Sequence, residues 1–180
     1  MGCRFSILLL AFSVFGASAS AQNTTHVRTS DPRMRRAIHD GVSRSTLFRE
    51  LVAQLDASDV IVYVEAEFLL PQHLQGRLTF LSAVGGQRYV RVGIACALAG
   101  PQQIAILAHE LKHATEIASA EGVIDEMSLA EEYQRIGFAS AGVNGSAGYD
   151  SRAAIDAGRR VWQELSSVAK PRHKVASADE

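Results

Sequence analysis

Cysteine is scarce in this 180-residue chain, which contains only Cys3 and Cys96. Two cysteines cannot form the disulfide framework of a small secreted scaffold. The chain also lacks an excess of charge, because 18 Lys and Arg residues face 19 Asp and Glu residues, for a net charge of −1. This balance excludes the basic surface typical of nucleic-acid binding and predicts no nucleic-acid partner. No glycine-rich phosphate loop and no nucleophile-elbow pattern occur either.

The composition is that of a globular protein, with 47% hydrophobic and 21% charged residues. A chain of this length is sufficient for one domain and too short for two well-packed ones. We therefore expect a single folded unit.

The first 21 residues show the three zones of a cleavable export signal. Arg4 provides a short positive zone, residues 5–15 form an apolar run, and small residues continue to Ala21. The apolar run is shorter than the roughly 20 residues that a membrane-spanning helix requires. We therefore expect cleavage after Ala19 or Ala21, a secreted or periplasmic location, and no membrane span in the mature protein.

The remaining sequence divides into a folded part and a tail. We assign residues 1–21 to the signal peptide, residues 22–168 to one domain, and residues 169–180 to a disordered tail. The tail contains Pro171 and lacks apolar periodicity, which is typical of a terminus that does not pack on the core.

Within the domain, apolar spacing and cap residues predict five helices, and a β-branched run predicts a strand. The expected helices cover residues 31–41 and about 44–55, 100–120, 125–136 and 150–165, and the expected strand covers residues 59–64. Asp150 is a candidate N-cap of the last helix. The glycine- and serine-rich segment 138–148 is expected to be a loop.

The dipeptide Gly85-Gly86 is the strongest hairpin signal in the chain. It separates residues 77–84 from residues 87–94, and in both segments apolar and polar side chains alternate. Two glycines can supply the positive φ angles of a two-residue turn. Together with the helices, this hairpin predicts an α+β fold, with a small antiparallel or mixed sheet packed on a helix.

The segment His109-Glu110-Leu111-Lys112-His113 matches the pattern H-E-x-x-H. On a helical wheel the two histidines lie about 40° apart, on the side opposite the apolar stripe of Leu107 and Leu111. We therefore expect the histidines to project from the face that does not pack on the core.

Hydrolytic zinc sites require residues of these types at this spacing. Two neutral imidazoles one helical turn apart hold the metal, an open position takes water, and a nearby carboxylate accepts the water's proton. The motif therefore predicts Zn²⁺ as the cofactor, His109 and His113 as metal ligands, and Glu110 as the general base.

Through residues 108–114 the chain resembles the zincin metallopeptidases. The resemblance implies a twisted sheet packed on the active-site helix, with an edge strand that binds extended peptide; residues 87–94 are the candidate edge. The metzincin extension is absent, because positions 116 and 119 are Glu and Ser. The resemblance is therefore to the gluzincin branch, in which a later acidic residue completes the site.

Several acidic residues are candidates for the third ligand. In a straight helix the Cα atom of Glu116 would be about 9 Å from the metal, beyond the reach of about 7 Å of a glutamate. Glu116 is therefore either a hydrogen-bond partner of a ligand or a residue without a special role. Asp150 is preferred, because its segment loosely resembles the acid-x-x-Ala helix of some gluzincins. The alternatives are Glu131, Glu132, Glu126 and Glu116.

These residues predict an exported zinc-dependent hydrolase, specifically a metallopeptidase that acts on a peptide or protein substrate. Tyr149, beside Asp150, is either a hydrogen-bond donor to an oxyanion or a packing residue. The alternative function is a non-catalytic, envelope-associated binding or structural protein on a zincin-like scaffold. The short mature chain favours this alternative, because it leaves little material to enclose a substrate.

Overall fold

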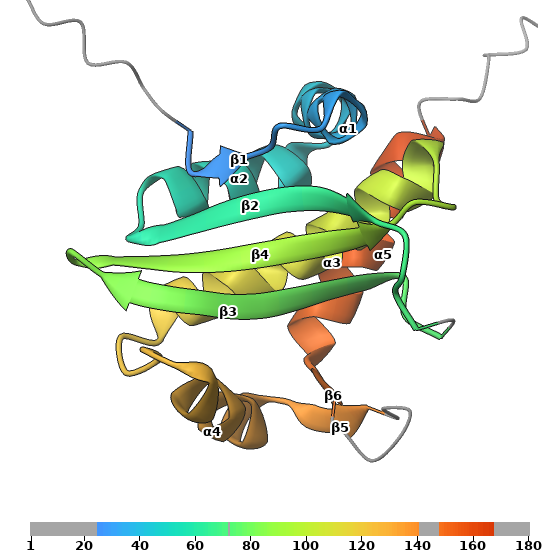
Figure 1. Ribbon diagram of the computed structural model, residues 1–180. Helices are drawn as coiled ribbons and strands as arrows, with labels where there is room; N and C mark the ends of the chain where they lie inside the picture. Colours follow the sequence, from blue (N-terminus) through green and yellow to red (C-terminus); the bar gives the residue numbers. More distant parts are fainter. Residues whose placement is uncertain (1–24, 72, 141–147, 168–180) are drawn as a thin grey trace, which may run out of the picture.

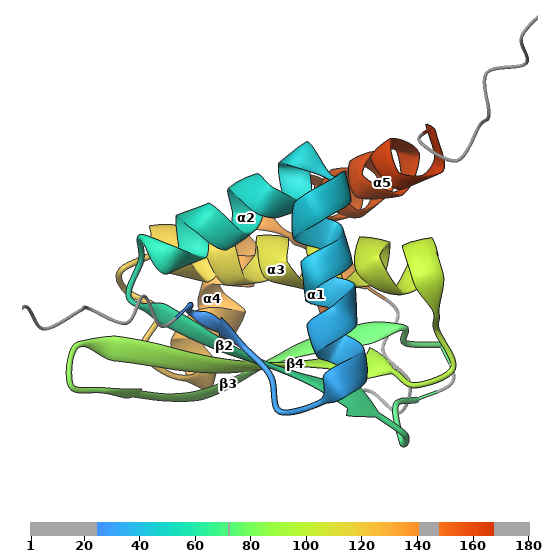
Figure 2. The same cartoon turned by 90° about the horizontal axis from the view of Figure 1, so that it is seen from above.

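The computed structural model describes residues 25–71, 73–140 and 148–167 (Figure 1). It contains a four-stranded mixed sheet, a two-stranded antiparallel sheet and five helices among these residues. Helices α1, α2, α3 and α5 lie over the same face of the larger sheet (Figure 2). The predicted α+β class is confirmed. The predicted signal peptide and tail lie outside the described residues.

The first helices are α1 (Pro32–Arg44) and α2 (Thr46–Asp56), which follow the short strand β1 (Val27–Arg28). The sequence predicted that the first helix would stop at Gly41, but α1 continues for three more residues. Gly41 is needed for packing instead: a Cβ atom there would lie 2.8 Å from the ring of Phe48. A glycine inside a helix can thus mark a close contact and not an end.

The larger sheet has the strand order β1-β2-β4-β3 and combines two pairing directions. Strand β2 (Val60–Glu67) pairs in parallel with β1 and β4, while β3 (Gly76–Val84) and β4 (Gln87–Ala95) pair antiparallel. The expectation that residues 87–94 form the edge strand is wrong, because β4 is enclosed between β2 and β3. The edge strand on this side of the sheet is β3, which pairs with β4.

The turn between β3 and β4 is the predicted two-residue connection. Gly85 and Gly86 have φ angles of 62° and 76°, and Val84 pairs with Gln87 across the turn. Two consecutive positive φ angles are the requirement of a tight turn that matches the twist of the flanking strands. The hairpin prediction is confirmed.

Helix α3 (Gly100–Ser119) carries the H-E-x-x-H motif through the middle of the molecule. Its apolar side packs on the sheet, where Leu107 and Leu111 join the buried residues of β2 and β4. The face that carries the histidines is nevertheless covered, because His113 is only 6% exposed and contacts Tyr133 and Glu116. Helix α5 (Arg152–Ser167) also packs on α3, and at Gly158 a Cβ atom would lie 3.3 Å from the Cβ atom of His109.

Below the β3 edge in Figure 1 lies an arm made of α4 (Glu126–Ile136), β5 (Phe138–Ser140) and β6 (Gly148–Asp150). We call these three elements the arm. Part of the predicted loop 138–148 therefore forms strands, since β5 and β6 pair antiparallel. Asp150 ends β6 and does not cap α5: the cap is Ser151, whose Oγ atom accepts a hydrogen bond from the backbone N–H of Ala154. This leaves the carboxylate of Asp150 free for other contacts.

Candidate metal site

Two elements bring the predicted ligands together. Helix α3 presents His109 and His113 on successive turns, with their ring centroids 4.8 Å apart. Strand β6 delivers Asp150 from the other side of the site, at the point where the chain passes into α5. Residues that are 37 positions or more apart in the sequence thus meet because the arm returns the chain to the middle of α3.

The three potential donor atoms form a small triangle. Nε2 of His109 lies 3.2 Å from Nε2 of His113, and these atoms lie 3.4 Å and 3.5 Å from Oδ1 of Asp150. His113 is buried, while the side chains of His109 and Asp150 remain 20% and 22% exposed. The group can therefore hold a metal ion and keep one side accessible to solvent.

The size of the triangle can be compared with a real coordination sphere. Tetrahedral zinc binds imidazole nitrogen and carboxylate oxygen at about 2.0–2.1 Å, which places neighbouring donor atoms about 3.3–3.4 Å apart. The three distances in this protein, from 3.2 to 3.5 Å, bracket that value. Three protein ligands leave the fourth tetrahedral position open, as in catalytic and not structural zinc sites.

A second set of side chains supports His113 from behind. Its Nδ1 atom lies 2.9 Å from Oε2 of Glu116 and 2.8 Å from the hydroxyl of Tyr133. Oε1 of Glu116 accepts a hydrogen bond of 2.6 Å from the hydroxyl of Ser151. Glu116 therefore contacts a candidate ligand and is not a member of the donor triangle, which agrees with the first of its two predicted roles.

The charges around the triangle favour a cation. Burial lowers the pKa of His113, but hydrogen bonds to Asp150 and Glu116 outweigh it and raise this pKa to about 9. The pKa of His109 is lowered, first by burial and then by the charge of His113. The pKa values of Asp150 and Glu116 are lowered because their contacts with the histidines outweigh burial. The charged carboxylates of Asp150 and Glu116 thus favour a cation at this place, and a divalent ion would bind there in competition with the proton of His113.

Glu110 lies on the sheet side of the same helix and is 5% exposed. Burial raises the pKa of its carboxyl group to about 7, although His113 and the backbone N–H of Leu78 act in the opposite direction. The carboxylate lies against β3: a Cβ atom on Gly76 would be 2.5 Å from Oε1 of Glu110. Glycine at this position makes room for the predicted general base beside the edge strand.

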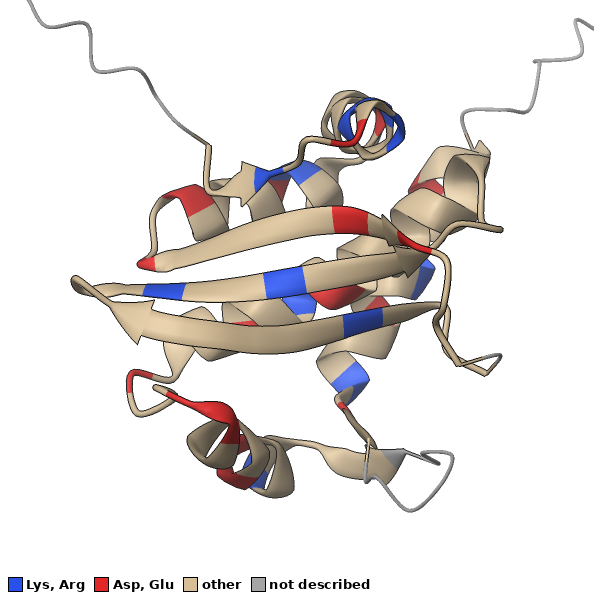
Figure 3. Ribbon diagram, viewed as in Figure 1, with Lys and Arg blue, Asp and Glu red and all other residues tan. Residues whose placement is uncertain are grey.

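The other acidic candidates are not part of the triangle. Acidic residues are frequent along α4 (Figure 3), but Glu126 and Glu131 are exposed and Glu132 pairs with Arg135. The hydroxyl of Tyr149 accepts a hydrogen bond of 3.3 Å from Gln134 at the surface. Among the donor groups of the described residues, only Asp150 joins the two histidines.

Sequence reasoning missed three residues of the site. Tyr133 and Ser151 carry hydroxyls that reach Glu116, and Gly76 provides space for Glu110. Tyr133 is 20 positions beyond His113, and no spacing rule connects the two residues. Ser151 could have been found, because a serine directly before a helical segment is a common N-cap, and it directly follows the preferred candidate ligand.

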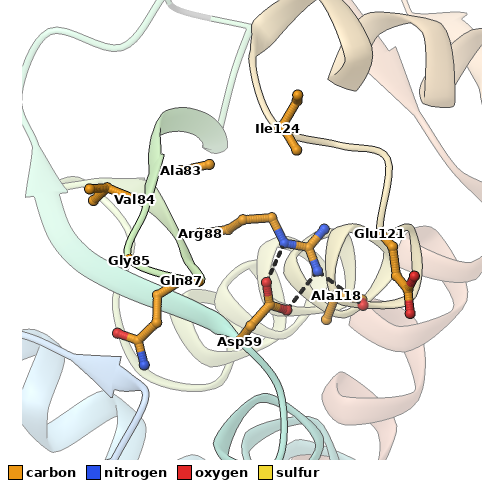
Figure 4. A pocket seen from close by; sticks show the side chains of 10 residues that line it. Asp59, Ala83, Val84, Gly85, Gln87, Arg88, Ala118, Glu121 and Ile124 are labelled. Carbon is orange, nitrogen blue, oxygen red and sulfur yellow. Dashed lines mark hydrogen bonds and ion pairs between the residues drawn. The ribbon is translucent and has the colours of Figure 1, made fainter.

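A separate buried charge lies at the far end of α3, beside a surface pocket (Figure 4). The Arg88 guanidinium binds both carboxylate oxygens of Asp59, at 2.7 Å and 2.6 Å. It also donates to the carbonyl oxygens of Ile117, Ala118 and Ala120, at the end of α3. We call Arg88, Asp59 and these carbonyls the Arg88 cluster. Its hydrogen bonds are directed within the protein, so it is a structural cap of the helix.

Comparison with known proteins gives no match: no protein-family model, no curated protein and no solved structure matches the chain. Within the described residues, none of the helices combines the length and the apolar character that crossing a membrane requires. Function is therefore inferred from the geometry of the site.

Proposed function

We propose that the protein is an exported zinc-dependent metallopeptidase in which His109, His113 and Asp150 bind the metal and Glu110 is the general base. The observation that carries this proposal is the donor triangle, whose edges of 3.2 to 3.5 Å fit tetrahedral zinc with one open position. Zinc is proposed over other divalent ions because two imidazoles and one carboxylate are a common ligand set of catalytic zinc.

The residues of the chain then have separate tasks. Zinc, when bound, would polarise a substrate carbonyl and make a water molecule more acidic. Glu110 accepts a proton, and its pKa of about 7 suits this task near neutral pH. Strand β3 is an edge of the sheet beside Glu110, so its backbone can hold an extended peptide by strand addition. This task also follows from the resemblance to zincins.

Export is part of the proposal and rests on the signal-like zones of residues 1–21. Mass spectrometry of the exported protein would give a first residue of Ser20 or Gln22. An intact Met1 in that fraction would exclude cleavage of a signal peptide.

The second candidate function is a non-catalytic binding or structural protein that holds a metal. The burial of Glu110, which is 5% exposed, favours it, because a general base must reach a water molecule in the site. The two candidates agree on the metal and differ on turnover.

The deciding experiment combines metal content with activity on a peptide library. The wild-type protein should contain one zinc ion per chain, and His109→Ala should lose it. Glu110→Gln should keep zinc but lose activity by about 10²- to 10⁴-fold, because the proton acceptor is removed and the ligands remain. Zinc without hydrolysis of any peptide would favour the second candidate, absence of zinc from the wild type would overturn the first, and absence of any bound divalent metal would overturn both.

A further inference from the structure

The inference concerns how the donor triangle is held in place, and it begins with the arm. In α4, which the structure describes in full, Tyr133 is the only buried residue. Its hydroxyl ends 2.8 Å from Nδ1 of His113 and donates to Oε2 of Glu116 at 3.3 Å. Tyr133, the buried residue of α4, thus contacts Nδ1 of His113, the ring nitrogen that is not part of the donor triangle.

Glu116 has a different partner for each of its oxygens. Oε2 faces Nδ1 of His113 at 2.9 Å, and Oε1 accepts from the hydroxyl of Ser151 at 2.6 Å. Its side chain is 10% exposed, so solvent competes little for these hydrogen bonds. One carboxylate therefore joins α3, the arm and the start of α5.

Ser151 connects Glu116 to Asp150, the proposed third ligand. Its hydroxyl caps α5, and its backbone N–H donates to Oδ1 of Asp150 at 2.6 Å. This is the same oxygen that lies 3.4 Å and 3.5 Å from the two histidines. The orientation of the Asp150 carboxylate thus depends on the residue that Glu116 holds.

We propose that Glu116 is the positioning residue of the site: it fixes His113 on one side and, through Ser151, Asp150 on the other. This proposal rests on the proposed metal site but not on catalysis. When Nδ1–H of His113 donates to Glu116, the lone pair of Nε2 is directed toward His109 and Asp150. Without the carboxylate either ring nitrogen can carry the proton, and the ring can turn. Tyr133 and Ser151 restrict the rotation of Glu116 itself.

The test measures zinc affinity by competition with a chromophoric chelator. Glu116→Leu should weaken binding about 10- to 100-fold. Glu116→Gln should weaken it less, because the amide oxygen still accepts from Nδ1–H. Ser151→Ala and Tyr133→Phe should have smaller effects in the same direction. Glu131→Gln, an exposed acidic position of α4, is the matched control and should bind zinc as the wild type does.

A second readout separates positioning from a general effect on folding. Nitrogen-15 NMR of the metal-free protein, at a pH where His113 is neutral, should show its proton on Nδ1. Glu116→Leu should shift this population toward Nε2, while Glu116→Gln should largely preserve it. Circular dichroism identifies any variant that does not fold, in which case the Gln variant decides. Unchanged zinc affinity and an unchanged His113 signal in a folded Glu116 variant would overturn the proposal.

The outcome is independent of turnover. If the wild-type protein binds zinc but hydrolyses no peptide, the proposed function fails and the role of Glu116 stands on the affinity series. If Glu110-dependent hydrolysis is found while the Glu116 variants bind zinc normally, the role of Glu116 fails and the proposed function stands.

Discussion

Helix α3 carries two buried polar groupings that differ in how their charges are balanced. At its C-terminal end, the Arg88 cluster contains its own cation, and the guanidinium is matched by Asp59 and by four carbonyl oxygens, that of Val123 included. In its middle, Glu110, Glu116 and Asp150 surround His109 and His113, so that acidic groups outnumber basic ones. The charges of the Arg88 cluster are therefore balanced within the protein, whereas acidic groups are in excess around His109 and His113.

The difference separates a charge pair that stabilises the fold from a group that could hold a metal ion. Buried charges are stable when they are paired and hydrogen-bonded, as Arg88 is. A partly exposed group of acids and imidazoles with donor atoms about 3.4 Å apart has only the proton of a histidine as its cation, and a divalent ion can replace that proton. The following experiments test this contrast, in order of decreasing expected effect.

Replacing Arg88 should cause the largest loss of stability. In Arg88→Met, Asp59 and the last carbonyls of α3 lose their partner. Each buried carbonyl left without a donor costs about 1–3 kcal/mol, and Asp59, which is 39% exposed, adds less. Urea unfolding in the presence of a chelator measures this directly. Arg91→Met, on the less buried face of β4, is the control and should change stability by about 0.5 kcal/mol or less. A similar loss in both variants would contradict the assignment of Arg88 as a helix cap.

Zinc should stabilise the protein through the donor triangle. At a free zinc concentration 100 times the Kd, the free energy of unfolding should rise by about 2.7 kcal/mol. Asp150→Ala should lose most of this gain, while Arg88→Met should retain it, because zinc does not act through the Arg88 cluster. Thermal unfolding with and without zinc checks both statements. Equal stabilisation of Asp150→Ala and the wild type would show that the ion binds elsewhere.

A methyl group beside Glu110, the proposed general base, should reduce turnover and leave metal binding unchanged. In Gly76→Ala the new Cβ atom would lie 2.5 Å from Oε1 of Glu110, so the carboxylate must move. A shift of about 1 Å in a catalytic group can slow a reaction up to about 100-fold, so turnover should fall by about 10- to 100-fold. Zinc affinity should stay within about twofold. Gly122→Ala, whose added Cβ atom meets nothing within 4 Å, is the control for a glycine replacement. Normal activity in Gly76→Ala would argue against Glu110 as the base.

The smallest effect concerns the acid dependence of the Arg88 cluster. The hydrogen bonds from Arg88 lower the pKa of Asp59 below its ordinary value of 3.8. Because the folded state holds the charged form, the stabilisation is present above pH 3.8 and is lost as the pH falls through the lowered pKa. The difference in unfolding free energy between the wild type and Asp59→Asn should therefore be constant near neutral pH and shrink below pH 3.8. A difference that does not depend on pH would mean that Asp59 acts without its charge.

Local features of the fold were predictable because they depend on neighbouring residues. The Gly85-Gly86 turn follows from the need for positive φ angles, and Asp125 begins α4 because its side chain accepts from the backbone N–H of Ser128. The extension of α1 past Gly41 was not predictable, because the reason is the ring of Phe48 in the next helix. The position of β4 inside the sheet likewise depends on pairing with β2, which comes from a distant segment.

The sequence by itself determined the candidate chemistry of α3. The spacing of His109 and His113 is set by the pitch of a helix, and the same pitch excluded Glu116 from direct ligation. Only the tertiary structure decided what surrounds them. It aims Asp150 at the histidines because Ser151 takes the cap of α5, and it places Tyr133 behind His113 and Gly76 against Glu110. The contacts of Asp150 with the histidines, of Tyr133 with His113 and of Gly76 with Glu110 join segments separated by 20 or more residues. The packing of whole elements, which no local pattern encodes, determines them.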